Sequence, residues 1–476
     1  MRRRMLHSAR ACYQRRRCSW RCMISVLLCS VVLTVVFTRE QLQAAISGTI
    51  TQHEVRRITC PACFGEDFCP VLARFQRRPD LGRKYLASGN GVHKGILARA
   101  GDSSGMAAST SPQPPTVFVI GKSLAYGKEL ATLNGNICMD AKARGVYNGD
   151  CTAGLTDQHV GRIALQAAES LLAGADWHGL YNMSHAEEVH SISHCVGDQL
   201  HKKIVHAYDG DGDGRLQANE AAMMRTSVMV NHEAVVLKAF PSSDGWPFPR
   251  YYGACGRMIF VEHSGAEMGD YMDKPWTVRV RVAKALVDTT IKLTDNAEQW
   301  IFHLLDVEED NFAVHYNSTL DRYVVTLIDL EHMIIVNKND PVFLGEFTSN
   351  DRVVSVSETF AACAKESRNC QVVFPAQLCA AGLQDTNYYY ICRNLLFADH
   401  HWAGDQIVSW TSGLLHDPPD KAVKQSLTRL ANECILNNQG HGRLQAYRKL
   451  SRLLSKLGSR SQDSGSSRRL ICEVKI

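Results

Sequence analysis

The chain has 476 residues, 45% of them hydrophobic and 21% charged, so it is long enough for two or three folded units and is not disordered as a whole. The formal net charge of +5 comes from the start of the chain, where residues 1–21 hold eight Arg and no acid. The remainder balances 45 basic against 48 acidic side chains, which excludes a basic surface and hence nucleic acid as a predicted partner.

Residues 22–37 form an uncharged apolar run directly after the basic start. The run predicts a single N-terminal membrane segment, assigned to residues 22–38. A long basic flank on its amino side favours a cytoplasmic tail at 1–21 and a type II signal anchor in the Golgi or endoplasmic reticulum membrane. Cleavage within residues 43–47, which would give a secreted protein, is the alternative. Both readings carry the rest of the chain across the membrane.

The cysteine content agrees with an oxidising compartment. Four of the 17 Cys lie in the first 29 residues, which leaves thirteen beyond the membrane segment. Cys60, Cys63 and Cys69 could be half of a zinc site, but no second Cys/His cluster supplies the missing ligands, so disulfides are favoured. The sequons at Asn182 and Asn317 are predicted glycosylation sites in the same compartment.

After a Cys-rich lead-in at 39–80, residues 81–260 contain features of a nucleotide-binding lobe. A glycine-rich segment at 89–95 resembles a turn between two strands. The apolar residues 117–121 predict a strand that ends at Lys122, which is where a kinase places its phosphate-binding lysine. Glu129 follows in a predicted helix, and we expect it to pair with Lys122.

Residues 209–220, with the sequence DGDGDGRLQANE, fill all twelve positions of an EF-hand loop. Apolar residues at helical spacing flank the loop within about 192–235. We expect a calcium site that orders this region, although the sequence leaves open whether calcium is structural or regulatory. The predicted ligands are Asp209, Asp211, Asp213, the Arg215 main chain, Gln217 and Glu220.

The most informative segment is residues 305–333. Asp306 precedes Asn311 by five residues, and an apolar strand after a polar turn at 317–322 ends at Asp329. Protein kinases use this order: the first Asp accepts the proton of the attacking hydroxyl, and the Asn and second Asp hold magnesium on the phosphates of ATP. The expected cofactor is therefore Mg²⁺ or Mn²⁺ with ATP, bound by Lys122, Asn311 and Asp329.

Departures from the kinase pattern are equally informative. The His-Arg that normally precedes the catalytic Asp is Leu304-Leu305, and the usual Asp-Phe-Gly is 329–331, Asp-Leu-Glu. Glu308 occupies the position that is often Lys. These differences support an alternative, a catalytically weak pseudokinase that acts as a Golgi or secreted signalling protein.

Seven ordered blocks of sequence recur in a known family. They are CPACFG at 60–65, GWPF at 245–248, YGACGRM at 252–258, LLDV at 304–307, DNFAV at 310–314, NYYY at 387–390 and GLLHDPP at 413–419. Together they resemble divergent protein kinase domain family 2, the deleted-in-autism-1 type, from about residue 59 to 455. The intact EF-hand is similar to that of the sister divergent kinase family 1. The resemblance implies that Lys122, Glu129, Asp306, Asn311 and Asp329 carry the kinase roles, and that the lobes connect near residues 253–262.

The predicted fold is α+β: a bilobal protein-kinase-like fold with an EF-hand inserted in the small lobe, preceded by one N-terminal membrane segment. Helical apolar spacing at 278–293 and 444–457 belongs to the large lobe, residues 261–457, and a polar tail follows at 458–476. The predicted activity is phosphate transfer to a hydroxyl of a secretory-pathway protein or glycan. The sequence leaves the oligomeric state open.

Overall fold

The computed structural model describes residues 55–77, 92–97, 117–124, 128–151, 155–182, 192–340, 379, 385–404, 406–436 and 442–465. The predicted membrane segment at 22–38 and most of the polar tail lie outside these ranges. Within them, no helix combines the length and apolar character that a bilayer crossing needs.

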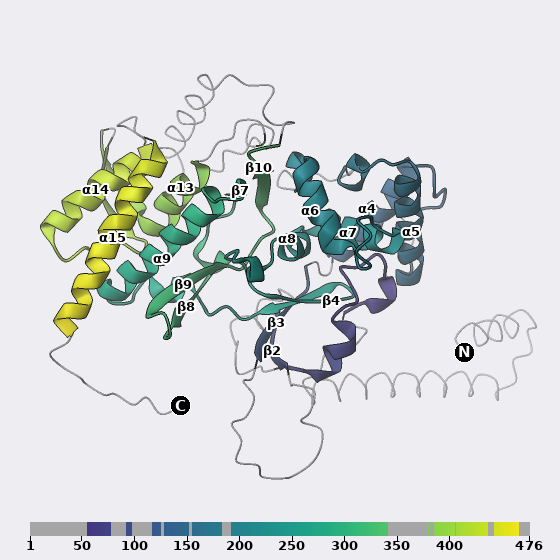
Figure 1. Ribbon diagram of the computed structural model, residues 1–476, viewed down its shortest axis with the longest axis horizontal. Helices are drawn as coiled ribbons and strands as arrows, with labels where there is room; N and C mark the ends of the chain where they lie inside the picture. The colour runs from purple at the N-terminus through teal and green to yellow at the C-terminus, as the bar shows by residue number, and fades with distance from the viewer. Residues whose placement is uncertain are drawn as a thin grey trace, which may run out of the picture.

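The N-terminal part is built on a five-stranded antiparallel sheet in the order β1-β2-β3-β5-β4 (Figure 1). The predicted strand that ends at Lys122 is confirmed as β3. Of the glycine-rich segment at 89–95, which was expected to be a turn, residues 92–95 belong to β2 and residues 89–91 lie outside the described ranges. Residues 253–262 belong to the sheet rather than connecting the lobes, and the chain leaves the sheet only after Glu262. The strands are β1 (Phe75–Arg77), β2 (Val92–Leu97), β3 (Val117–Lys122), β4 (Tyr251–Cys255) and β5 (Met258–Glu262).

A group of helices is inserted between β3 and β4. The apolar spacing at 192–208 suggested one helix, but the structure has a short 3-10 turn and then α6, with a break at Gly197. The Asp340 carboxylate packs against Gly197 and accepts a hydrogen bond from the Gln199 main-chain nitrogen at 3.3 Å, so it caps α6. The helices are α4 (Lys128–Ala143), α5 (Asp157–Ala173), α6 (Asp198–Tyr208), α7 (Ala218–Val230) and α8 (Glu233–Ala239).

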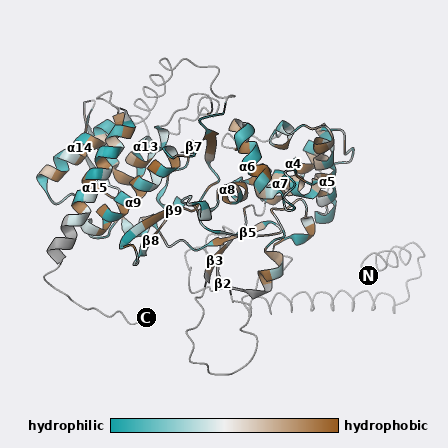
Figure 2. Ribbon diagram, viewed as in Figure 1, coloured by the Kyte–Doolittle hydropathy of each residue, from teal (hydrophilic) through white to brown (hydrophobic). Residues whose placement is uncertain are grey.

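The C-terminal part is mostly helical, with short antiparallel strand pairs. The predicted hairpin is confirmed, since β8 pairs with β9 around the polar turn. The helices expected at 278–293 and 444–457 lie within α9 and α15, which pack against each other, and Figure 2 shows hydrophobic and hydrophilic residues on both. The elements are β6 (Ala266–Glu267), α9 (Trp276–Thr294), β7 (Trp300–Leu304), β8 (Phe312–Asn317), β9 (Arg322–Leu327), β10 (Met333–Asn337), α13 (Thr386–Ile391), β11 (Ala398–Ala403), β12 (Gln406–Ser412), α14 (Lys421–Leu436) and α15 (Arg443–Gly465).

Short 3-10 and π turns complete the described chain. They are η1 (Arg57–Thr59), η2 (Cys69–Arg74), η4 (His178–Leu180), η5 (Ile192–Cys195), η6 (Ser242–Asp244), η7 (Met268–Tyr271), η8 (Glu309–Asn311) and the π turn η9 (Cys392–Leu396).

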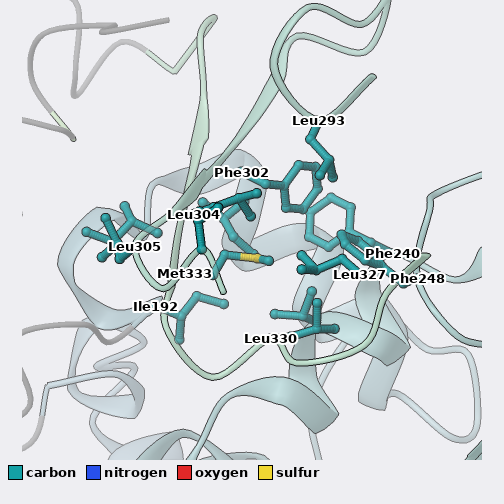
Figure 3. Close-up of a cluster of buried hydrophobic side chains, with 14 of the residues drawn as sticks. Ile192, Phe240, Phe248, Leu293, Phe302, Leu304, Leu305, Leu327, Leu330 and Met333 are labelled. Carbon is teal, nitrogen blue, oxygen red and sulfur yellow. The ribbon is translucent and has the colours of Figure 1, made fainter. Parts of the chain in front are cut away.

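A continuous hydrophobic core joins the two parts beneath the predicted site (Figure 3). Phe302 of β7 lies at its centre, with edge-on ring contacts to Phe240 at the end of α8 (4.9 Å) and to Phe248 (5.3 Å). Edge-to-face aromatic pairs stabilise a core beyond their buried area. Strand β7, which leads into the loop of Asp306 and Asn311, and helix α8 are thus fixed relative to each other.

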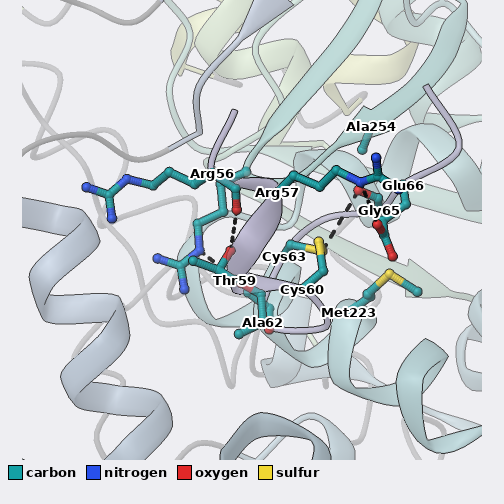
Figure 4. Close-up of a disulfide and its surroundings, with 12 residues drawn as sticks. Arg56, Arg57, Thr59, Cys60, Ala62, Cys63, Gly65, Glu66, Met223 and Ala254 are labelled. Atoms are coloured by element: carbon teal, nitrogen blue, oxygen red, sulfur yellow. Dashed lines mark hydrogen bonds and ion pairs between the residues drawn. A yellow bond between two sulfur atoms is a disulfide. The ribbon is translucent and has the colours of Figure 1, made fainter. Parts of the chain in front are cut away.

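The disulfides expected from the cysteine content are present in the described residues. Cys60 bonds to Cys63, beside the Arg57–Glu66 ion pair (Figure 4), and Cys69 bonds to Cys255 of β4. With these three cysteines oxidised, none is available as a zinc thiolate. The other bridges in the described residues are Cys138–Cys151, Cys195–Cys379 and Cys392–Cys434.

Candidate functional site

The structure brings Lys122 of β3 against Glu233, the first residue of α8. The Lys122 Nζ lies 2.8 Å from the Glu233 Oε1, and it also donates to the Ile328 carbonyl at 2.5 Å. The side chains are only 16% and 2% exposed, so the ion pair is shielded from water. Figure 1 places α8 in the middle of the molecule, between the inserted helices and the C-terminal part. The pair therefore joins the sheet to the helix that faces the second part.

The expected pairing of Lys122 with Glu129 is wrong. Glu129 lies exposed in the first turn of α4, and the Lys122 ion pair in the structure is with Glu233. The reason is the insertion of α4 to α7 after β3, which moves the pairing helix 111 residues along the chain. The usual separation between the lysine and its acidic partner therefore does not locate Glu233. The acidic residue that begins the apolar helix at 233–239 is the sequence feature that could have indicated it.

Asp306 and Asn311 lie on the loop that follows β7. The Asn311 Nδ2 donates to the Asp306 carbonyl at 3.1 Å, and the Asn311 carbonyl accepts from the Ile328 nitrogen at 2.8 Å. The second bond fixes the chain one residue before Asp329. Asp306, Asn311 and Asp329 line one small hollow together with His332. The three residues predicted from their spacing are thus brought together.

Asn387 of α13 holds the strand that leads into this loop, a role that its local sequence does not predict. Its buried side chain accepts a hydrogen bond from the Leu304 nitrogen at 2.9 Å. It donates to the Phe302 carbonyl at 2.7 Å and to the Thr294 hydroxyl at 2.8 Å. The Asn387 amide therefore links β7 to α9 and α13. This is the structural role of the first residue of the NYYY block.

Negative charge exceeds positive charge around the ion pair. Burial alone would lower the pKa of Lys122, but Glu233, Asp329 and Glu331 together raise it above its ordinary value. Burial raises the pKa of Glu233 to about 7; Lys122 opposes this shift and Asp329 adds to it. Burial likewise raises the pKa of Asp329, against the effect of Lys122. One lysine faces three carboxylates, so the pocket favours additional cationic charge.

A divalent cation fits this pocket chemically. Mg²⁺ prefers hard oxygen ligands and commonly binds through one or two protein groups together with phosphate oxygens. The Asp329 carboxylate and the Asn311 side-chain oxygen are the groups placed to hold it. Glu331 was not predicted for the site; its two oxygens lie 2.9 Å from the Asn231 Nδ2 and 3.3 Å from the His332 Nε2.

Asp209, Asp211 and Asp213 lie on the loop between α6 and α7. One carboxylate oxygen from each falls within 4.8 Å of the others, a spacing that could hold a metal ion. Hydrogen bonds from the Gly214 and Gly212 main chain, the first being the larger cause, lower the pKa of Asp209 and favour its charged form.

The remaining predicted ligands close this loop. The Glu220 oxygens accept from the Gly210 nitrogen at 2.9 Å and the Gln217 nitrogen at 2.8 Å, and the Gln217 Nε2 donates to Asp211 at 2.8 Å. The Arg215 nitrogen donates to Asp213 at 2.8 Å. The helix–loop–helix shape is thus closed by its own carboxylates.

The two sequon asparagines differ in surroundings. Asn182 is exposed just after η4. Asn317 is half-buried at the end of β8, where its side-chain oxygen accepts from the Leu320 nitrogen at 3.0 Å. Glycosylation at either site stays a prediction.

A lysine–glutamate pair between a sheet and a helix, with Asp306, Asn311 and Asp329 around one hollow, defines a protein-kinase-like domain. The family described as the protein-kinase domain of FAM69 matches residues 226–437. Human divergent protein kinase domain 2A is 29% identical over 441 residues, which cover 90% of this chain and 94% of the relative. The mouse protein is 30% identical over 84% of this chain and 86% of the relative.

The chain belongs to the divergent protein kinase domain 2 family. Human divergent protein kinase domain 2B shows a shorter similarity, 29% identity over 144 residues, which cover 28% of this chain and 33% of that relative. No solved structure matches the chain.

Proposed function

We propose that this chain binds ATP with Mg²⁺ or Mn²⁺ and transfers the γ-phosphoryl group to a hydroxyl of a lumenal or secreted protein or glycan. The observation that carries the proposal is that Asp306, Asn311 and Asp329 line one hollow, while Lys122, paired with Glu233, donates to the carbonyl of the residue just before Asp329. A chain that had lost catalysis would have no chemical reason to keep this arrangement.

Each residue has a distinct role in this proposal. Lys122, oriented by Glu233, contacts the phosphates, while Asn311 and Asp329 hold the metal ion, which neutralises phosphate charge when bound. Asp306 accepts the proton of the acceptor hydroxyl as its oxygen bonds to the γ-phosphorus. The bond from that phosphorus to the bridging oxygen breaks, and ADP leaves.

The pseudokinase alternative has one specific observation in its favour. Glu308, where many kinases have Lys, is exposed beside the catalytic loop. Burial first, then Asp306, Asp310 and Glu309, raise the pKa of Glu308, so no basic group there balances the transferring phosphoryl. Under this alternative the fold would be retained for binding, with weak or no transfer.

Phosphoryl transfer distinguishes the two functions. The lumenal region, made in a secretory host, is incubated with labelled Mg-ATP and secreted proteins as acceptors. Wild type should label acceptors, and Asp306→Asn should reduce labelling at least 100-fold, as expected for loss of a general base, with nucleotide affinity nearly unchanged. Equal labelling by wild type and Asp306→Asn would contradict transfer by this site and support the pseudokinase.

The loop between α6 and α7 is part of the proposal as an EF-hand that binds calcium. Asp209, Asp211, Asp213, Gln217 and Glu220 supply side-chain oxygens, and Arg215 its carbonyl. Secretory compartments hold abundant calcium, so a site of modest affinity would remain filled and would order the inserted helices.

The location proposed is the Golgi or endoplasmic reticulum membrane, with one N-terminal segment at 22–38 and a lumenal domain. Secretion after cleavage is the alternative. The disulfides of the described residues support a lumenal or extracellular environment.

A further inference from the structure

The two residues that join α7 to α8 both contact the segment after Asp329. Asn231 is 7% exposed, and its Nδ2 donates to the Glu331 Oε2 at 2.9 Å. His232 is 2% exposed. Burial first, then His332, lowers the pKa of its ring, while Glu331 and the Met333 main chain oppose this shift, so the ring lies beside the same segment. The junction is therefore held against residues 329–333 by the Asn231 hydrogen bond, with the His232 ring buried next to it.

The other end of the Asn231 amide orients the helix that carries the ion pair. The Asn231 Oδ1 accepts a hydrogen bond from the Glu233 nitrogen at 2.8 Å, which satisfies one of the free main-chain donors at the start of α8. The Asn231 nitrogen donates to the Ser227 carbonyl at 3.0 Å and ends α7. Asn231 thus contacts α7, α8 and the segment 329–333 that follows Asp329.

Glu331 would compete with Glu233 for Lys122 if it were free to move. The Glu331 Oε1 lies 3.3 Å from the His332 Nε2 and the Glu331 Oε2 lies 2.9 Å from the Asn231 Nδ2, so each carboxylate oxygen has its own partner. The Glu331 charge raises the pKa of Lys122, which indicates that the two groups are close. The hydrogen bond from Asn231 to a charged acceptor is of the stronger kind and holds this carboxylate away from the lysine.

We propose that Asn231 is a positioning residue that keeps Glu331 in place and sets Glu233 against Lys122 for nucleotide binding. The inference rests on the proposed function for its nucleotide readout. In structural terms, Asn231 bridges the inserted helices and the segment that carries Asp329.

Asn231→Asp tests the bridge with almost no change of volume. The aspartate retains an acceptor for the Glu233 nitrogen but places a carboxylate oxygen where Nδ2 donates, opposite Glu331. Affinity for Mg-ATP should fall roughly tenfold or more, since a hydrogen bond to a charged acceptor is replaced by like-charge repulsion. Affinity within twofold of wild type would overturn the proposal.

A second substitution, at residue 331, exchanges the donor and the acceptor of this hydrogen bond. In Asn231→Asp/Glu331→Gln, the glutamine amide can donate to the aspartate, and affinity should return to within roughly threefold of wild type. Glu331→Gln alone keeps an acceptor for Asn231 and should have little effect. A double variant as weak as Asn231→Asp would overturn the bridge, because a general packing defect is not rescued from the other side.

Hydrogen exchange provides a readout that does not need nucleotide. Amides of residues 328–334 and of α8 should exchange roughly tenfold faster in Asn231→Asp and recover in the double variant. If Asn231→Asp fails to fold, Glu331→Ala removes the acceptor from a side chain that is 44% exposed, and the same exchange increase is expected. Failure of wild type to bind Mg-ATP would contradict the proposed function, while unchanged exchange would contradict the bridge.

Discussion

Lys122 and Glu233 form the contact on which the site depends. Both side chains are buried, and removal of one partner of a buried pair leaves the other charge without compensation. Glu129, which is exposed at the start of α4, is also a glutamate but lies outside this pair, so it can serve as a control.

Glu233→Gln should weaken Mg-ATP binding at least tenfold, about 1.4 kcal/mol, because Lys122 loses the charge that orients it. Glu129→Gln is the matched control and should bind like wild type. Titration calorimetry of both variants measures the difference. If Glu129→Gln bound Mg-ATP more weakly than Glu233→Gln, the assignment of Glu233 as the partner of Lys122 would be wrong.

The pKa of Glu233 makes nucleotide binding pH-dependent. Since its folded pKa of about 7 lies above the ordinary value of 4.5, Glu233 contributes stability at low pH that is lost as pH rises through 7. Mg-ATP binding needs the charged form, so affinity should rise between pH 6 and 8. Binding measured at several pH values in wild type and Glu233→Gln tests this, and a rise of equal size in both would contradict it.

At the residue scale the sequence predicted Lys122, Asp306, Asn311 and Asp329 because their roles depend on short spacings within one loop or strand. Glu233 could not be located by spacing because helices α4 to α7 separate it from Lys122 by 111 residues. Asn387 escaped for a related reason. Its partner β7 lies 83 residues away, and no local pattern records that contact.

At the scale of elements, α7 connects two functional regions. Its first turn carries Glu220, which closes the aspartate loop, and its last residue, Val230, precedes Asn231, which donates to Glu331 in the segment after Asp329. Order in the loop is therefore expected to reach α8 through one helix of 13 residues.

Calcium should stabilise the protein through this loop. At a calcium concentration 100 times the Kd, binding adds about 2.7 kcal/mol to the free energy of unfolding. Chelation should lower the melting temperature of wild type, and Glu220→Gln should remove most of this dependence. Glu169→Gln, an exposed substitution on α5, is the control; equal calcium shifts in both variants would argue against the loop as the site.

Local patterns predicted the helices at 278–293 and 444–457, which lie within α9 and α15, and the hairpin β8–β9, because each buries a periodic apolar face. The break before α6 was missed. It depends on Asp340, a residue 141 positions beyond the Gln199 nitrogen it accepts from, and periodicity within 192–208 cannot reveal that contact.

For the whole molecule, disulfides join segments that are distant in the chain. Cys69–Cys255 spans 186 residues and ties the lead-in segment to β4, whereas Cys60–Cys63 closes a loop of 3. Cys195–Cys379 spans 184 residues and links the inserted region to the C-terminal part.

Cys69→Ser/Cys255→Ser should reduce the free energy of unfolding by about 4–5 kcal/mol, since a long closed loop constrains the unfolded chain most. Cys60→Ser/Cys63→Ser should cost about 2 kcal/mol by the same relation. Chemical denaturation of the two double variants compares them. A larger loss from the short loop would show that chain entropy is not the main contribution.

The proposed function requires that the hollow lined by Asp306, Asn311 and Asp329 binds Mg-ATP. Titration calorimetry of Mg-ATP into the chain after residue 38, with its disulfides formed and calcium present, measures this binding. Wild type and Asp244→Asn, an exposed control, should bind alike, and Asp329→Asn should show no measurable heat. Absence of binding by wild type, or equal binding by Asp329→Asn, would contradict the claim.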